Sequence, residues 1–324
     1  MKNLGRREFL RNTAASALGV SVFSWANPLA SKTDQTKSIG ISKRRLGKTD
    51  HQVSIISLGG AQPGNQDEEV AIIHRALDLG INYIDTSEGY GGGRSESYIG
   101  EVMQSRRKEV FLSTKTQQRT KHGIEDSLFE KSCNRLQTDF IDLYFLHAVD
   151  SMNDLNSVLD RDEGAIRAFE RLREKGRIGN IGISSHSIEI LDVALQKYDF
   201  DCILVTVNPA GITGIPAIEQ RLDGLYNQNP KRTREFLQKI AEKDVGIIAM
   251  KIPARHKIFE RDITMEQSLT YALSAGHTGN AFPVSTAVIG ISNIEQINEN
   301  VRFAGRYRPY NAAEMDQMEA LAFG

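Results

Sequence analysis

After its first forty residues the chain alternates short, β-branched segments with longer segments of helical periodicity, and this alternation constrains the fold more than any other feature. Val53 to Leu58 is apolar and ends at a glycine pair, as a buried strand should. Residues 67–79 follow, with apolar side chains at helical spacing and Gly80 as a stop. The same order recurs, and the predicted strands are 53–58, 82–84, 110–113, 141–146, 180–183, 202–207, 245–249 and 286–289.

Each of these eight predicted strands is followed by a predicted helix. The helices are 67–79, 95–104, 124–136, 163–175, 188–197, 231–243, 265–274 and 294–303. Repeated strand–helix units imply a parallel sheet, and eight of them over about 280 residues favour a closed (β/α)8 TIM barrel of the α/β class. An open doubly wound sheet fits less well, because Gly59 to Gly64 does not match the GxGxxG dinucleotide fingerprint.

The first thirty residues have the layout of a targeting signal. The pair Arg6-Arg7 precedes Phe9-Leu10, an apolar run spans 13–25, and small residues with a proline occupy 26–30. The run is shorter than the ~20 residues that a membrane span needs, so we expect no stable membrane anchor. No charged face interrupts residues 14–22, which argues against an ordinary amphipathic helix. The segment resembles a twin-arginine (Tat) signal, which implies a periplasmic or otherwise exported protein with the Tat machinery as a partner.

The chain is therefore expected to contain a signal over 1–30, a polar linker over 31–42 and one barrel domain over 43–324. Its formal net charge of -1 provides no field that would attract nucleic acid. The two cysteines, Cys133 and Cys202, lie in no CxxC pair and near no histidine cluster, so we expect no metal site.

Polar residues follow three successive predicted strands. Asp85 comes after the second strand with Tyr90 five residues further on, and Lys115 and His147 follow the third and fourth strands. The chemistry of such a barrel lies at these strand ends, so the four side chains should converge. Each alone has an ordinary explanation: a turn cap, an exposed loop aromatic, a surface charge and a core imidazole, respectively. Their joint placement favours a functional site.

The chemistry of these four residue types suits the reduction of a carbonyl group. The carbonyl oxygen needs a proton as hydride reaches the carbon, and a tyrosine hydroxyl can donate one. A nearby ammonium such as that of Lys115 favours the phenolate and would make donation easier. A buried lysine in turn needs a carboxylate, which Asp85 could supply. His147 could hydrogen-bond the substrate oxygen and fix its orientation.

The segments that carry these residues resemble the aldo-keto reductases. Residues 84–91 read Ile-Asp-Thr-Ser-Glu-Gly-Tyr-Gly, which is similar to the family's Asp-Thr-x-x-x-Tyr-Gly motif. Residues 113–115 and 142–147 end in the family's Lys and His, and 44–49 resembles the entry into its N-terminal β-hairpin. The resemblance covers nearly all of residues 43–301. It implies a barrel with an N-terminal hairpin and a C-terminal helix.

The resemblance also implies an oxidoreductase that passes hydride between a nicotinamide cofactor and a small carbonyl or alcohol substrate. In this family pattern Tyr90 is the general acid, Lys115 and Asp85 tune it, and His147 orients the substrate. Ser184 and Ser185 match the segment that grips the nicotinamide carboxamide, although Ser185 is a shorter donor than the usual residue. Leu204 and Val207 stand where a glutamine and an aromatic are usual, so carboxamide binding and ring stacking should differ here.

Two further segments are expected to hold the cofactor. Met250 and Lys251 follow the seventh predicted strand, where Ser-Pro-Leu is common in the family. Residues 290–300 resemble the family's segment in which a loop and a helix N-terminus hold the adenosine phosphate and a Glu-Asn pair contacts adenine. The resemblance implies that Gly290, Ser292, Gln296, Glu299 and Asn300 bind the cofactor, with Glu299 and Asn300 at the adenine. Many members have Arg where Ser292 stands, so a 2′-phosphate would depend on Ser292 with Lys251, Arg255, Lys257 or Arg261. NADP is favoured over NAD. A plain helix capped by Ser292 fits the same residues.

Two other functions remain open on the sequence. Lys115 at a strand end could form a Schiff base, as in a lyase of the aldolase type. Alternatively, the chain could be a cofactor-binding sensor or subunit with little turnover. The export signal adds a constraint, because a periplasmic enzyme would not readily regenerate a diffusible cofactor. We therefore expect the cofactor to be loaded before export, retained tightly, and recycled by alternating oxidation and reduction of two substrates.

Overall fold

The computed structural model describes residues 40–61, 63–221, 229–279 and 281–323. The predicted export signal and most of the predicted linker lie outside these residues. Within the described ranges, no helix combines the length and the apolar character that crossing a membrane requires.

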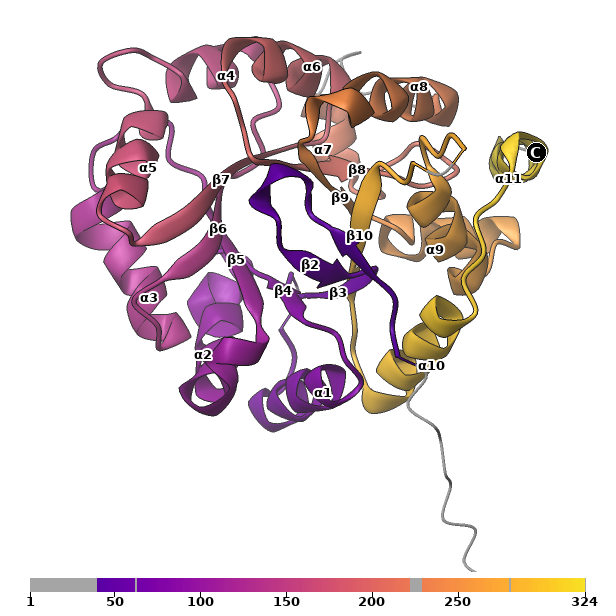
Figure 1. The fold of residues 1–324 in the computed structure, drawn as a ribbon, viewed down its shortest axis with the longest axis horizontal. Helices are drawn as coiled ribbons and strands as arrows, with labels where there is room; N and C mark the ends of the chain where they lie inside the picture. Colours follow the sequence, from indigo (N-terminus) through magenta and orange to yellow (C-terminus); the bar gives the residue numbers. More distant parts are fainter. Residues whose placement is uncertain (1–39, 62, 222–228, 280, 324) are drawn as a thin grey trace, which may run out of the picture. The chain divides into compact units, whose positions relative to one another are not determined.

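Eight parallel strands close into a barrel in the order β10-β3-β4-β5-β6-β7-β8-β9 (Figure 1). Every neighbouring pair is parallel, including the closing pair β10–β3. This confirms the predicted (β/α)8 barrel, and each barrel strand overlaps its predicted range. Their bounds are β3 Ile56–Gly59, β4 Tyr83–Asp85, β5 Phe111–Thr116, β6 Ile141–Leu146, β7 Ile178–Ser185, β8 Cys202–Thr206, β9 Gly246–Met250 and β10 Val284–Gly290.

Helices surround the strands, as Figure 1 shows. Those that overlap the predicted helices are α1 Gln66–Asp78, α2 Arg94–Arg106, α3 Glu130–Leu136, α5 Ala165–Glu174, α6 Ile188–Lys197, α8 Pro230–Ile240, α9 Met265–Ser274 and α10 Ile294–Gly305. Side-chain caps explain several of their starts: Asn65, Ser187 and Thr264 each accept a backbone N–H of the first turn. Three more helices are α4 Met152–Val158, α7 Pro216–Arg221 and α11 Ala312–Phe323, the last being the expected C-terminal helix.

An antiparallel hairpin of β1 (Lys43–Arg45) and β2 (Gln52–Ser54) precedes the barrel. In Figure 1 this indigo hairpin crosses the ring of strands. Its Leu46 and Val53 are fully buried and pack with side chains of the barrel lumen, so the hairpin covers the amino-terminal end of the barrel. Gly47 has φ +50°, and a Cβ there would lie 2.2 Å from the backbone nitrogen of Gly246, so only glycine fits this approach.

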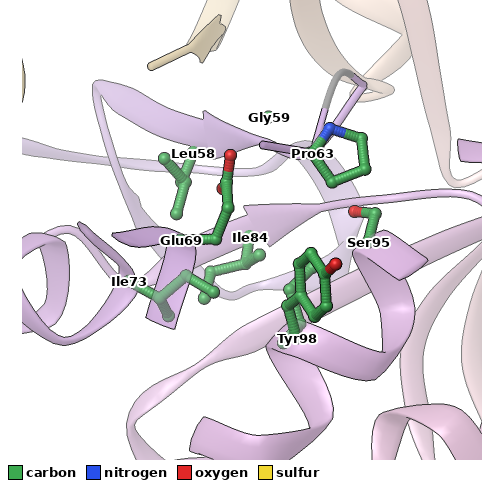
Figure 2. A pocket seen from close by; sticks show the side chains of 10 residues that line it. Leu58, Gly59, Pro63, Glu69, Ile73, Ile84, Ser95 and Tyr98 are labelled. Carbon is green, nitrogen blue, oxygen red and sulfur yellow. The ribbon is translucent and has the colours of Figure 1, made fainter. Parts of the chain in front are cut away.

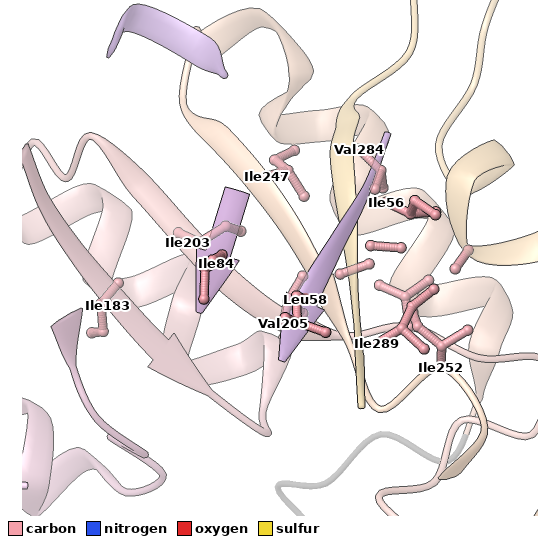
Figure 3. Packing of buried hydrophobic residues seen from close by; sticks show 14 of the residues in the cluster. Ile56, Leu58, Ile84, Ile183, Ile203, Val205, Ile247, Ile252, Val284 and Ile289 are labelled. Atoms are coloured by element: carbon pink, nitrogen blue, oxygen red, sulfur yellow. The ribbon is translucent and has the colours of Figure 1, made fainter. Parts of the chain in front are cut away.

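The barrel separates two apolar clusters. The larger cluster lies between the strands and the helices, and Figure 3 shows part of it, including Ile56 of β3 and Ile289 of the neighbouring strand β10. The smaller cluster fills the lumen and contains Tyr83, Phe111 and Phe145. Along β4, β5, β6, β8 and β9, successive apolar side chains alternate between the two clusters. Residues that continue the inward series past the lumen cluster therefore reach the carboxyl-terminal mouth of the barrel.

Candidate active site at the barrel mouth

Lys115 and Asp85 form a buried ion pair at the carboxyl ends of β5 and β4. The Lys115 Nζ atom lies 2.6 Å from Asp85 Oδ2 and donates to the Thr86 carbonyl at 2.6 Å. Ser113 donates to the other Asp85 oxygen at 2.7 Å. Lys115 has no exposed surface, so its ammonium is shielded from solvent. The two predicted residues are therefore in direct contact.

Tyr90 lies over this pair, at the start of a short 3-10 turn (Tyr90–Gly93) that leads into α2. The Lys115 ammonium is 4.8 Å from the centre of the Tyr90 ring. The Tyr90 and His147 rings meet edge to face, with centres 5.7 Å apart and planes at 83°. The structure thus brings the four predicted catalytic residues into one cluster.

Ser87, which the sequence interpretation did not single out, holds His147. Its hydroxyl lies 3.1 Å from His147 Nδ1 and 3.3 Å from the Lys115 carbonyl oxygen. Burial lowers the pKa of His147 well below 6.5, and the charges of Lys115, His186 and Lys251 lower it further. The His147 ring is therefore neutral at neutral pH.

The protonation of Tyr90 and Lys115 follows from burial and their mutual charge. Burial raises the pKa of Tyr90 above 10.0, and the opposing charge of Lys115 does not outweigh that effect. The charge of Lys115 thus lowers the pKa of Tyr90, as expected, but burial raises this pKa by more. Burial lowers the pKa of Lys115, yet Asp85 and Tyr90 raise it more, and the net shift is upward from 10.5. At neutral pH Tyr90 is a phenol and Lys115 an ammonium.

Glu88 fixes the loop between Asp85 and Tyr90. Its Oε1 atom accepts hydrogen bonds from the Thr116 hydroxyl at 2.7 Å and the Gln117 backbone at 3.2 Å. These bonds tie the loop after β4 to the end of β5, which keeps Tyr90 over Lys115. Burial raises the pKa of Glu88.

Ser184 and Ser185, the expected carboxamide contacts, are buried at the end of β7. Ser184 Oγ accepts from the Ala148 backbone at 2.8 Å, and Ser185 Oγ donates to Asp150 at 3.2 Å. Both hydroxyls therefore also join β7 to the loop that follows His147. This loop contains Asp150, a buried carboxylate that the sequence interpretation had not singled out.

Thr206 is the polar residue at the mouth end of β8. Leu204 packs in the lumen cluster and Val207 in the outer cluster, so the alternation of β8 directs Thr206 inward beside its register partner Met250. The Thr206 hydroxyl is buried and has no hydrogen-bond partner among the described residues. Extending the inward series Cys202–Leu204 by two residues would have identified it from the sequence.

Lys251, directly after β9, is a half-buried cation in a left-handed backbone conformation, with φ 60°. Buried Asn208 donates to the Lys251 carbonyl at 3.0 Å and to the Ile212 carbonyl at 2.7 Å, which ties the loop after β8 to Lys251. Within the described ranges nothing pairs with the Lys251 ammonium. Burial, with the charges of Lys115 and Arg255, lowers its pKa to about 8. The Lys251 ammonium is thus a cation at the mouth with no direct ion-pair partner among the described residues.

The other residues expected to bind the cofactor lie around β10 and α10. Gly290 ends β10, Ser292, Gln296 and Glu299 are exposed, and Asn300 is buried. The cap of α10 is Asn293, which accepts from the Gln296 backbone at 2.9 Å; the alternative with Ser292 as the cap is wrong. Ser292 lies one residue before the N-cap position, so its side chain does not cap the helix. Among the residues that the structure describes, none hydrogen-bonds to the Ser292 hydroxyl.

Three more cationic residues that the sequence suggests for the phosphate lie in the 3-10 segment Ala254–Arg261 after β9, and they differ in their partners. Lys257 pairs with Glu260 at 3.0 Å, and Arg261 donates to the Ala322 carbonyl. Arg255 is exposed, and no described residue pairs with its guanidinium. Lys251 and Arg255 are therefore the cations of this set that remain available to an anion.

A small enclosed pocket lies apart from this cluster. Figure 2 shows it between β3, α1 and α2, lined by residues that include Leu58, Glu69, Ser95 and Tyr98. Its volume of about 10 Å³ is enough for a single water molecule at most. It is too small for a substrate.

Comparisons with known proteins agree with this geometry. The model of the Aldo/keto reductase family matches residues 55–268. An uncharacterized oxidoreductase of Bacillus subtilis, YqkF, is 29% identical over 294 residues, which cover 82% of this chain and 92% of YqkF.

Solved structures point to the same fold. The holo form of aldo-keto reductase AKR11C1 from Bacillus halodurans superposes with a TM-score of 0.69 and 26% identity, over 87% of this chain and 96% of that one. An aldo-keto reductase from Klebsiella pneumoniae, solved in complex with NADPH, shares the fold with a TM-score of 0.61 and 22% identity, over 87% of this chain and 95% of that one. The chain is an oxidoreductase and belongs to the aldo/keto reductase family.

Proposed function

We propose that this protein transfers hydride between NADP(H) and a small carbonyl or alcohol substrate, with Tyr90 as the general acid in reduction. The convergence of Tyr90, His147 and the buried Lys115–Asp85 pair carries this proposal. It places a protonated phenol, a neutral imidazole and a paired ammonium around one point at the mouth.

The residues have distinct parts in the proposed reaction. A bound nicotinamide cofactor supplies the hydride in reduction and accepts it in the reverse direction. In this proposal His147 Nε2–H donates to the substrate oxygen, which requires His147 Nδ1 to accept from the Ser87 hydroxyl 3.1 Å away. Tyr90 then gives its proton to that oxygen. Lys115 stabilises the phenolate that forms, and Asp85 keeps the ammonium charged and in position.

The mouth residues fit a dinucleotide that is anionic and carries an amide. The Thr206 hydroxyl, which has no hydrogen-bond partner within the described ranges, faces the mouth beside Met250, as a hydrogen-bonding group for an amide would. Lys251 and Arg255 provide unpaired positive charge, and the N-terminus of α10 with Ser292 provides further donors. Gln296, Glu299 and Asn300 follow on α10 and would contact the adenosine. The NADPH complex of the Klebsiella relative supports NADP as the cofactor.

The test uses the purified full chain with NADPH or NADH and a series of aldehydes and ketones, followed by nicotinamide absorbance. We expect NADPH-dependent turnover that Tyr90→Phe lowers about 10²- to 10⁴-fold. Tyr98→Phe on α2, away from the mouth, is the matched control. Wild-type turnover in Tyr90→Phe would contradict the proposal. NADPH binding without turnover of any carbonyl would instead indicate a sensor or subunit.

The geometry of Lys115 argues against the Schiff-base alternative. A lysine must be neutral and accessible to attack a carbonyl carbon. Lys115 is fully buried, donates to Asp85 and Thr86, and has its pKa raised. Borohydride in the presence of a carbonyl substrate should therefore trap no adduct on Lys115. A mass increase on the peptide that contains Lys115 would instead support the Schiff-base lyase function.

We also propose that residues 1–30 direct Tat export and that the cofactor travels with the folded chain. The arginine pair and the short apolar run support this proposal. A chain with Arg6→Lys and Arg7→Lys should stay in the cytoplasm while wild type is found in the periplasm. Protein purified from the periplasm should carry nicotinamide dinucleotide, detected by mass spectrometry. Equal periplasmic amounts of both chains would disprove export by this route, and loss of all cofactor on desalting would disprove retention.

A further inference from the structure

Arg119, which has no part in the reaction described above, joins the loop after β5 to the loop after β6. Its Nη1 atom donates to the Gln117 and His147 carbonyls, both at 3.0 Å, and Nη2 donates to the Ala148 carbonyl at 2.8 Å. The Nε atom donates to Asp154 of α4 at 2.9 Å, where the two side chains form an ion pair. The planar fork of an arginine serves acceptors in several directions, whereas a lysine carries all its donors on one nitrogen.

Ala148, one of the residues that Arg119 holds, has a left-handed backbone conformation with φ 51°. This region is unfavourable for a residue with a Cβ, and such a conformation persists where the surrounding contacts impose it. Here the contacts come from two sides. The Ala148 N–H donates to Ser184 Oγ of β7 at 2.8 Å, and the Ala148 carbonyl accepts from Arg119. The conformation of Ala148 therefore depends on side chains from outside its own loop.

The backbone of His147 is held by the same guanidinium. Its N–H donates to the Thr116 carbonyl at 2.9 Å, which continues the ladder between β5 and β6, and its carbonyl accepts from Arg119. Further along the loop, Asp150 Oδ2 lies 3.0 Å from His186 Nδ1, which anchors the loop to the residue after β7. The two peptides that flank the His147 Cα atom set the direction of its side chain. Arg119 therefore acts on the imidazole through the backbone.

We propose that Arg119 is a positioning residue for the reduction: by holding the His147 and Ala148 carbonyls, it imposes the left-handed conformation at Ala148 and keeps the His147 imidazole in place for the substrate oxygen. This inference rests on the proposed function, in which His147 orients the carbonyl. A displacement of about 1 Å in an orienting group lowers a rate by up to about 10²-fold. Loss of Arg119 should therefore lower kcat.

Arg119→Met tests this role, because it removes all four hydrogen bonds and keeps an unbranched side chain. With saturating NADPH and aldehyde, kcat should fall about 10- to 100-fold. The affinity for NADPH, followed by cofactor fluorescence, should change little, since none of the four acceptors belongs to a residue expected to bind the cofactor. An unchanged kcat in an active protein overturns the inference alone. Wild type that turns over no carbonyl would overturn the proposed function, and the inference with it.

Arg107→Met is the matched control, because Arg107 joins the same two strands at their opposite ends. Its guanidinium donates to the Val110 carbonyl before β5 and the Phe140 carbonyl before β6, and it pairs with Asp142 at 2.6 Å. The two arginine side chains are similarly exposed, 22% for Arg107 and 24% for Arg119. A purely structural role of Arg119 predicts similar losses of stability and of kcat in both variants. The positioning role predicts that only Arg119→Met loses kcat, and equal losses of kcat overturn it.

Ala148→Gly separates positioning from folding. Glycine adopts a φ of about +50° without the steric cost of a Cβ, so the backbone no longer needs Arg119 to impose it. In the Arg119→Met background, Ala148→Gly should raise kcat about 5- to 10-fold, as the preference of glycine over alanine for this region allows. The same change should bring no such gain in the wild-type background. A gain of equal size in both backgrounds, or none in either, overturns the inference.

The comparison does not depend on the folding of Arg119→Met. If that variant does not fold, Arg119→Lys and Arg107→Lys replace the two methionine variants. Lysine keeps the positive charge, but its ammonium is too compact to serve two separate carbonyls and a carboxylate at once. The expected loss of kcat in Arg119→Lys, its rescue by Ala148→Gly and the outcomes that overturn the inference are the same.

Discussion

The Lys115 ammonium lies 2.6 Å from the Asp85 carboxylate at the top of a lumen that is otherwise mainly apolar. Lys115 has no exposed surface and Asp85 only 3%. In such surroundings each charge depends on the other, because removing one leaves the second without compensation. The pair that prepares Tyr90 for proton donation should therefore also be needed for the stability of the barrel.

Lys115→Met should lower the free energy of unfolding in urea by about 3–5 kcal/mol, because it leaves Asp85 buried with hydrogen bonds but no cation. Asp85→Asn should have a similar effect through the unpaired ammonium. The double variant should be more stable than the sum of the two losses predicts, since neither charge remains. Additive losses in this double-mutant cycle would contradict direct coupling between the two residues.

The pH dependence of reduction follows from the protonation of Tyr90 and His147. Tyr90 must be protonated, and burial keeps its pKa above 10.0; His147 must be neutral, and burial keeps its pKa well below 6.5. With saturating NADPH, kcat should therefore be level between these limits. It should fall only as pH drops through the lowered pKa of His147 or rises through the raised pKa of Tyr90.

A substitution can identify the group whose protonation lowers kcat at low pH. His147→Gln keeps a hydrogen-bond donor but cannot be protonated, so the profile of this variant should lose the acid limb while its level region is lower than that of wild type. An acid limb that persists in His147→Gln would assign it to another group.

Glu96 of α2 should be a second point at which one substitution destabilises the fold. This fully buried carboxylate pairs with Arg135 at 2.6 Å and accepts from Thr114 at 2.7 Å, so it joins α2, α3 and β5. Arg135→Met leaves the buried charge unpaired and should lower the free energy of unfolding by about 3 kcal/mol. Arg306→Met, which breaks an exposed pair with Glu266, is the control and should change it by less than about 1 kcal/mol. Similar losses in both variants would contradict the role of burial.

The strand ends that carry Asp85, Lys115 and His147 could be predicted because their position depends on local periodicity. The single predicted strand 53–58 was wrong in detail, since β2 and β3 are separate strands. Ser54 exchanges hydrogen bonds with Asn82, 28 residues away, and its hydroxyl donates to the Ile56 carbonyl. The hydrogen bonds between Ser54 and Asn82 lie at the break between β2 and β3. The spacing of apolar residues along the sequence does not reveal such bonds between distant residues.

The helix predicted over 124–136 also differs in detail. Residues Ile124–Phe129 form a π-helical segment, and α3 begins only at Glu130. Apolar spacing does not distinguish the two helical forms over so few residues. The pairing of Asp150 with His186 was missed for a related reason, because the two lie 36 residues apart and meet only when β6 and β7 are neighbours.

Lys251→Met should stabilise the protein without cofactor and weaken cofactor binding at the same time. The folded state lowers the pKa of Lys251 from 10.5 to about 8, so between these values the unfolded chain binds more protons and stability rises with pH. Below about pH 8 the buried, unpaired charge is fully present and destabilising. Removing it should raise the free energy of unfolding at pH 7 by about 1–3 kcal/mol, and this gain should shrink above pH 8.

The same substitution removes one of the two cations available to an anionic ligand at the mouth, so the KM for NADPH should rise about 10-fold or more. Lys257→Met is the matched control, because the Lys257 ammonium is exposed and already paired with Glu260. It should change neither the free energy of unfolding nor this KM appreciably. Urea unfolding at several pH values measures the first effect and steady-state kinetics the second. If Lys251→Met were less stable than wild type at pH 7 and kept the wild-type KM, Lys251 would be a structural residue and the phosphate groups would have to bind elsewhere.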